Sequence, residues 1–186
     1  MTNQINEWQA EHDNFRRLLD LLESQIGLFH EAAQPNYELM LDIIYYLRHY
    51  PDRVHHPRED AAIARLVDRD SSARNMARRL LGEHEVLARS GTQLLEQLDC
   101  IVSDALVSRE ALEASAATYI TYYRQHMSRE EADLFPRAEK LFRRSDWAAV
   151  DSAIATTTDP LFGKQVEQRY QQLNRRIALE AGSAND

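Results

Sequence analysis

An imidazole and a carboxylate stand four residues apart at two places in this 186-residue chain. The first pair is His55 and Glu59, and the second is His126 and Glu130. On a helix, residues at this spacing lie on one face, so each pair presents both side chains to one point. Imidazole nitrogen and carboxylate oxygen are ligands that suit borderline divalent metals such as iron, manganese and zinc. Each pair is therefore a candidate half of a metal site.

The residues around these pairs predict that the polar groups are buried. Apolar residues share one helical face with the second pair: Leu112, Ala116, Tyr119, Tyr123 and Leu134. His12 and His84 lie on similar apolar stripes elsewhere in the chain. Burying a carboxylate is costly unless something pairs with it. We therefore expect a metal site inside the core with six ligands: His12, His55, Glu59, His84, His126 and Glu130.

Plainer interpretations exist for some of these residues. His12 could be an ordinary core histidine bonded to a backbone group, and Glu59 and Glu130 would reach the surface if the helix phase were one residue off. His56 could replace His55, although only His55 has Glu59 four residues further on. The acids next to the two glutamates, Asp60 and Glu131, are expected to face solvent.

Four segments with helical apolar periodicity must position these groups. They run approximately over residues 3–30, 36–66, 73–102 and from 108 into 136, with short turns between them. This pattern predicts an all-α, up-down-up-down four-helix bundle. In the second segment, the apolar period resumes in phase after Pro51 and Pro57, which predicts a continuous helix bent between Tyr50 and Pro57. Pro136 should bend or end the fourth helix.

The residues after the bundle predict additional C-terminal helices. Ser145 can cap a short helix, and Asp159-Pro160 predicts the start of a last helix over 161–179. The apolar stripe of this last segment suggests packing against the bundle or against a second subunit, as in a homodimer. We therefore divide the chain into a bundle with the metal site at 1–143, a helical extension at 144–181 and a disordered tail at 182–186.

Composition narrows the classes of partner. The formal net charge is −8, and the basic residues do not cluster, which argues against nucleic acid and anionic membranes. Cys100 stands alone, so one chain can form neither a disulfide nor a cysteine metal cluster. The first eight residues lack an apolar leader, and no apolar run is long enough to span a bilayer. A cytoplasmic location is the expectation.

Taken together, the motifs resemble the hemerythrin family, specifically the hemerythrin-like HHE cation-binding proteins of bacteria. The resemblance covers about residues 1–143, and residues 159–163 also resemble the tail of bacterial members. The matching pieces are Glu11-His12, His55-His56-Pro57-Arg58-Glu59-Asp60, Glu83-His84, and His126 to Pro136.

The resemblance implies a non-haem centre of two iron ions, bridged by an oxo or hydroxo group and by Glu59 and Glu130. The four histidines of the predicted site would be terminal ligands, although other divalent metals could also fit. Oxygen-carrying hemerythrins have a second histidine on the third helix, where this chain has Leu80 and Ala88 on either side of His84. One terminal ligand is therefore missing unless water, His56 or a neighbouring carboxylate supplies it.

The implied function is to bind or sense dioxygen, nitric oxide or iron. Two alternatives stay open. One is a diiron enzyme that reduces peroxide or nitric oxide or aids iron–sulfur repair. The other is a zinc-loaded or metal-free helical interaction module.

Overall fold

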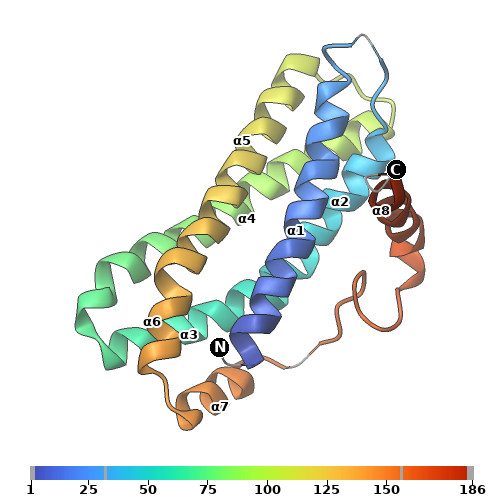
Figure 1. Cartoon of the computed structure of the whole chain (residues 1–186). Helices are drawn as coiled ribbons and strands as arrows, with labels where there is room; N and C mark the ends of the chain where they lie inside the picture. The colour runs from blue at the N-terminus through green and yellow to red at the C-terminus, as the bar shows by residue number, and fades with distance from the viewer. Residues whose placement is uncertain (1–2, 32, 156, 184–186) are drawn as a thin grey trace.

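Every regular element is helical in the described part of this computed structural model, which comprises residues 3–31, 33–155 and 157–183. Four helical runs form a bundle (Figure 1). The first is α1 (Asn3–Gly27), and the second passes from α2 (Tyr37–His49) through η1 (Pro51–His55) into α3 (His56–Arg69). A short turn, η2 (Ser71–Ala73), leads to the third run, α4 (Arg74–Val102). The fourth passes from α5 (Arg109–Arg129) through η3 (Glu130–Leu134) into α6 (Phe135–Leu141).

The second and fourth runs share one irregularity, a π-helical turn that ends two residues before a proline. The N–H of His56 donates to the carbonyl of Pro51, and the N–H of Phe135 donates to the carbonyl of Glu130, each five residues back. Because proline cannot donate and clashes with the preceding turn, an extra residue in that turn lets the helix continue past it. The predicted continuity of the helix between Tyr50 and Pro57 is confirmed.

Two apolar clusters form the core, and the predicted polar groups lie between them. The larger cluster includes Phe15, Leu19, Leu47, Leu94 and Tyr123, and the smaller includes Ile5, Trp8, Leu66, Phe135 and Trp147. Along α1, His12 falls between Trp8 of one cluster and Phe15 of the other. Apolar side chains therefore pack against the polar groups from both sides, which limits how far the polar side chains can move.

The C-terminal helices follow the bundle and pack on it. Helix α7 (Arg144–Ala153) contacts α3, and its Trp147 joins the smaller cluster. The expected cap at Ser145 is wrong: the helix begins after Arg143, whose N–H donates to the carboxylate of Asp146. No described helix is both long and apolar enough to cross a membrane.

The predicted last helix over 161–179 is also wrong at its start. A turn occupies residues 160–162, bends follow at 163–165, and η4 (Gln168–Tyr170) precedes α8 (Gln171–Ser183). Leu161 and Tyr170 are both buried in the bundle core. Nine residues of unbroken helix would turn these two side chains to opposite faces, so a loop is needed to bury both.

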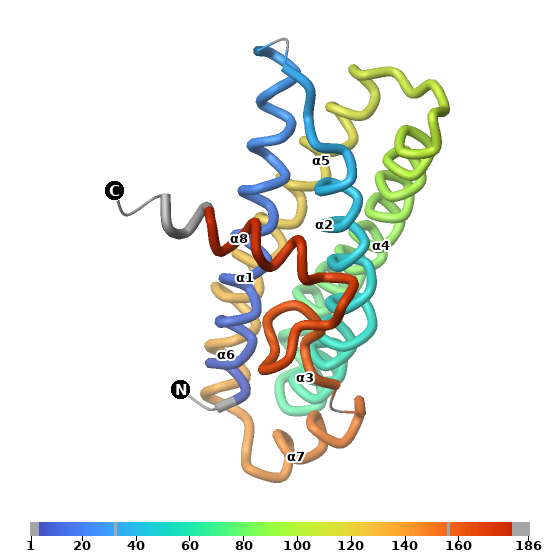
Figure 2. The backbone as a smooth tube through the Cα atoms, turned by 90° about the vertical axis from the view of Figure 1, so that its right-hand side faces the viewer, coloured from blue at the N-terminus to red at the C-terminus, as the bar shows by residue number. Residues whose placement is uncertain are grey.

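Helix α8 crosses α1 and α2 on the outside of the bundle (Figure 2). Its Leu173 and Ile177 are buried against the larger cluster. Of the tail expected at 182–186, residues 184–186 lie outside the described part, whereas residues 182 and 183 end α8.

Asp159 ties the loop before η4 to the bundle, and we expect Asp159→Ala to destabilise the protein. Its carboxylate accepts the Tyr46 hydroxyl at 2.8 Å and the N–H groups of Leu161 and Phe162 at 2.8 and 2.9 Å. Losing these bonds leaves a buried hydroxyl unpaired, so the free energy of unfolding should fall by about 2 kcal/mol. Chemical denaturation measures this loss.

Asp151→Ala is the matched control for this experiment. Asp151 accepts one exposed hydrogen bond, from Gln4, so its removal should change stability by less than about 0.5 kcal/mol. Equal effects of the two substitutions would contradict the anchoring role of Asp159.

Candidate metal centre

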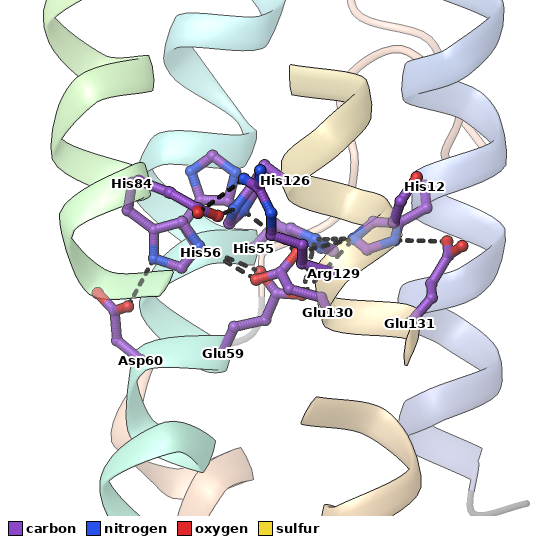
Figure 3. A network of polar contacts seen from close by, with 12 residues as sticks. His12, His55, His56, Glu59, Asp60, His84, His126, Arg129, Glu130 and Glu131 are labelled. Carbon is purple, nitrogen blue, oxygen red and sulfur yellow. Dashed lines mark hydrogen bonds and ion pairs between the residues drawn. The ribbon is translucent and has the colours of Figure 1, made fainter. Parts of the chain in front are cut away.

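The six predicted site residues come together in the centre of the bundle (Figure 3). Each long helical run contributes, and none of the six residues is more than 7% exposed. The contributors are His12 from α1, His55 from η1, Glu59 from α3, His84 from α4, His126 from α5 and Glu130 from η3. The interpretation that places Glu59 and Glu130 on the surface is therefore wrong.

Glu59 lies between two groups of histidines: His12 and His55 form one, and His56, His84 and His126 form the other. Its Oε1 is 3.3 Å from His55 Nε2 and 3.6 Å from His12 Nε2. Its Oε2 lies on the other side, 3.7 Å from His84 Nε2. One carboxylate thus faces both groups at once.

Glu130 also approaches both groups, although both of its oxygens face the group that contains His84 and His126. Its Oε1 is 3.3 Å from His84 Nε2, while its Oε2 is 3.2 Å from His126 Nε2 and 3.6 Å from His12 Nε2. Both glutamates therefore lie between the two histidine groups. The potential donor atoms fall into two sets, each within 4.8 Å, which share Glu59 and do not include Glu130: His56, Glu59, His84 and His126, and then His12, His55 and Glu59.

A fifth histidine, His56, belongs to the first of these sets. It is 4% exposed, and its ring stacks on that of His84 with 4.4 Å between centroids. The sequence prediction did not include His56 as a ligand, because only His55 has Glu59 four residues further on. A signal was available in Asp52, which precedes His56 by four residues and contacts its Nδ1 at 3.0 Å.

Each of the five imidazoles has its Nδ1 against a carboxylate. A neutral imidazole whose Nδ1–H donates to such a supporting acid keeps its Nε2 lone pair free for a metal, so the acid fixes both tautomer and ring orientation. The pairs are His12 with Glu131 at 2.9 Å, His55 with Glu11 at 2.5 Å, His56 with Asp52 at 3.0 Å, His84 with Asp60 at 2.7 Å and His126 with Glu83 at 3.2 Å.

Outer side chains hold several supporting acids in turn. Arg16 contacts Glu131 at 2.6 Å, Arg129 contacts Glu83 at 2.8 Å, and Arg48 pairs with Asp52. The Tyr50 hydroxyl donates to Glu11 at 2.7 Å. These contacts restrict the acids and, through them, the imidazoles.

Asp60 and Glu131 are partly exposed to solvent, as expected, but they also contact the site. Asp60 remains 42% exposed and Glu131 28% exposed, yet each bonds a buried histidine. Sequence reasoning lacked the contact information, because each partner histidine is at least 24 residues away in the chain. Adjacency to Glu59 and Glu130 was the only available hint.

The electrostatic state of the cluster without metal reflects these contacts. Burial alone would lower the pKa of His55, but the charge of Glu59 and the hydrogen bond to Glu11 raise it to about 10. The pKa of His84 is also raised to about 10, because the bonds to Asp60 and Glu130 outweigh burial. For His56, burial and the neighbouring histidine charges lower the pKa well below its usual value.

Several buried donor atoms fit metal ligation better than hydrogen bonding. Among the described residues, no hydrogen-bond partner is found for either oxygen of Glu59, for Oε2 of Glu130 or for Nε2 of His126. A buried carboxylate left in this state is costly. Cations between the carboxylates and the imidazole lone pairs would satisfy all of these atoms.

The family model for the hemerythrin HHE cation-binding domain matches residues 3–138. The chain belongs to this hemerythrin family. All five histidines, both glutamates and the five supporting acids lie within the matched residues. Searches of curated proteins and of solved structures found no match to the chain. The expected hemerythrin-like bundle with additional C-terminal helices is confirmed, and the buried histidine–glutamate cluster fits a metal-binding helical protein.

Metal binding to this hemerythrin-family site should release protons and weaken in acid. With pKa values of about 10, His55 and His84 carry protons at neutral pH without metal, whereas ligation needs an unprotonated Nε2. Affinity for iron(II) under anaerobic conditions should rise from pH 6 to 8, with about two protons released. Calorimetry in buffers of different ionisation enthalpy counts these protons, and affinity independent of pH would contradict the assignment.

We expect Glu131→Gln to weaken metal binding although Glu131 is not placed as a ligand. An amide in place of the carboxylate loosens the hold on the His12 ring, and loss of such support costs about 10- to 100-fold in affinity. Competition with a chelator measures the change. Glu85→Gln is the control, because Glu85 is exposed beside His84 and pairs only with exposed Arg89 among the described contacts. Similar affinities in both variants would refute the supporting role.

Proposed function

We propose that the chain is a non-haem diiron protein that binds or senses dioxygen, nitric oxide or iron through an oxo- or hydroxo-bridged centre. The observation that carries this proposal is the placement of Glu59 and Glu130, each of which faces both histidine groups. Carboxylates between two sets of nitrogen donors are suited to two neighbouring ions rather than to one.

The ligand assignment follows from the two donor groups. His56, His84 and His126 would hold one ion, His12 and His55 would hold the other, and the glutamates would bridge them. His56 then supplies, from the second helical run, the terminal ligand that Leu80 and Ala88 cannot. Its Nδ1 contact with Asp52 matches the carboxylate support of the other four histidines, which favours the same role for all five.

The unequal division of histidines suggests where a small ligand would bind. One ion would have three imidazoles and the other two, which leaves a coordination position on the second ion without a protein donor. A bound diiron pair would supply reversible ligand binding and electron transfer at that position. The protein's part is to fix the donors through the supporting acids and to limit water through the two apolar clusters. Phe15 and Phe135 pack against His12, with ring centroids 6.3 and 5.4 Å away.

Single substitutions test the ligand set. We expect His126→Ala and Glu130→Ala to lose iron, and His56→Ala to lose at least the ion of its own group, because each removes a buried donor. Elemental analysis measures iron per chain, and the absorption bands of an oxo-bridged pair report whether both ions are present. Glu85→Ala, on the exposed face of α4, should retain the wild-type content.

Two iron ions retained by His126→Ala and Glu130→Ala would refute the ligand assignment. Zinc in place of iron, after expression with added iron, would instead support a structural metal site. If only His56→Ala kept the full iron content, His56 would not be the missing terminal ligand, and water would be assigned to that position.

A further inference from the structure

Tyr123 has a buried hydroxyl without a hydrogen-bond partner among the described residues. The side chain is 1% exposed and lies on α5 one helical turn before His126. Some of the other unpartnered atoms have an explanation: those of Glu59, Glu130 and His126 belong to the metal centre, and Arg48 and Asp52 pair with each other. The atoms of Trp8, Gln97 and Trp147 have none. Since an unpaired buried hydroxyl destabilises a fold, the Tyr123 hydroxyl needs a reason of its own.

The Tyr123 ring lies in the wall shared by both histidine groups. Its centroid is 5.9 Å from that of His56, in the three-histidine group. On its other side it meets Phe15 edge-on at 6.2 Å, and Phe15 in turn contacts His55 at 5.0 Å, in the two-histidine group. Tyr123 and Phe15 thus cover the larger-cluster side of the site together.

The ordinary pKa of a tyrosine hydroxyl is about 10, so the Tyr123 hydroxyl carries its proton at neutral pH. A protonated phenol in an apolar wall can donate one hydrogen bond. Phe15, the adjacent member of that wall, offers none.

We propose that the Tyr123 hydroxyl donates a hydrogen bond to a small anionic or polar ligand bound at the open coordination position of the centre. This inference rests on the proposed diiron function. It makes α5 a determinant of ligand selectivity in addition to a source of metal donors. Ligands whose outer atom accepts a hydrogen bond would be favoured over those whose outer atom does not.

Azide provides the test, using the full chain loaded with iron and oxidised. In Tyr123→Phe, we expect the wild-type iron content and about tenfold weaker azide binding, the effect of one hydrogen bond to an anion. Titration of the azide–iron absorption band measures the dissociation constant. The metal-free variant should melt at the wild-type temperature or above, because no internal bond is lost.

Tyr119→Phe is the matched control. Tyr119 is equally buried, contacts Tyr123 at 5.6 Å and lies one further turn from His126, so its variant should bind azide as the wild type does. A tenfold loss confined to Tyr123→Phe would support the inference.

Other outcomes would overturn it in distinguishable ways. Unchanged azide affinity in Tyr123→Phe with full iron would remove the donor role and leave the diiron function intact. Loss of iron from Tyr123→Phe would show that the oxygen is a ligand, and a lower metal-free melting temperature would show that it has a protein partner. Wild-type protein that binds no iron would refute the proposed function and this inference with it.

Discussion

Two glutamates buried in the centre of a helical bundle are the constraint on which the rest of this structure depends. Glu59 and Glu130 are fully buried, and the Nε2 atoms of four histidines lie within 3.7 Å of their oxygens. Without metal, protonated histidines compensate the negative charge of the neighbouring carboxylates, which raise the pKa values of His55 and His84. With cations in place, the same histidines would be neutral ligands. Metal binding at this site would therefore exchange histidine protons for cations.

The supporting acids form a closed ring around this centre. In four of the five pairs, the acid is adjacent in sequence to one site residue but bonds a histidine on the next helical run. Neighbouring residues on a helix point about 100° apart, so one faces the centre while the other faces the adjoining helix. The circuit runs from Glu11 to His55, from Asp60 to His84, from Glu83 to His126 and from Glu131 back to His12.

This ring links metal geometry to the packing of the bundle. A shift of one helix would move an acid away from a histidine that another helix presents. The two π-helical turns contribute to the same register, because each lies within or beside a histidine–glutamate pair and sets the phase of the residues around it. The C-terminal loop reaches the ring indirectly, since Asp159 bonds Tyr46, and Tyr46 stacks on Tyr50, the donor to Glu11.

The sequence by itself determined the four helical runs, the inward direction of the six predicted site residues and the continuity of the helix through Pro51 and Pro57. These features follow from local periodicity, which is readable along the chain. Only the tertiary structure decided the place of His56, the partners of Asp60 and Glu131, and the loop that buries both Leu161 and Tyr170. Each of these depends on contacts between residues far apart in the chain. Spacing along one helix records which face a residue occupies, but not which side chain it meets there.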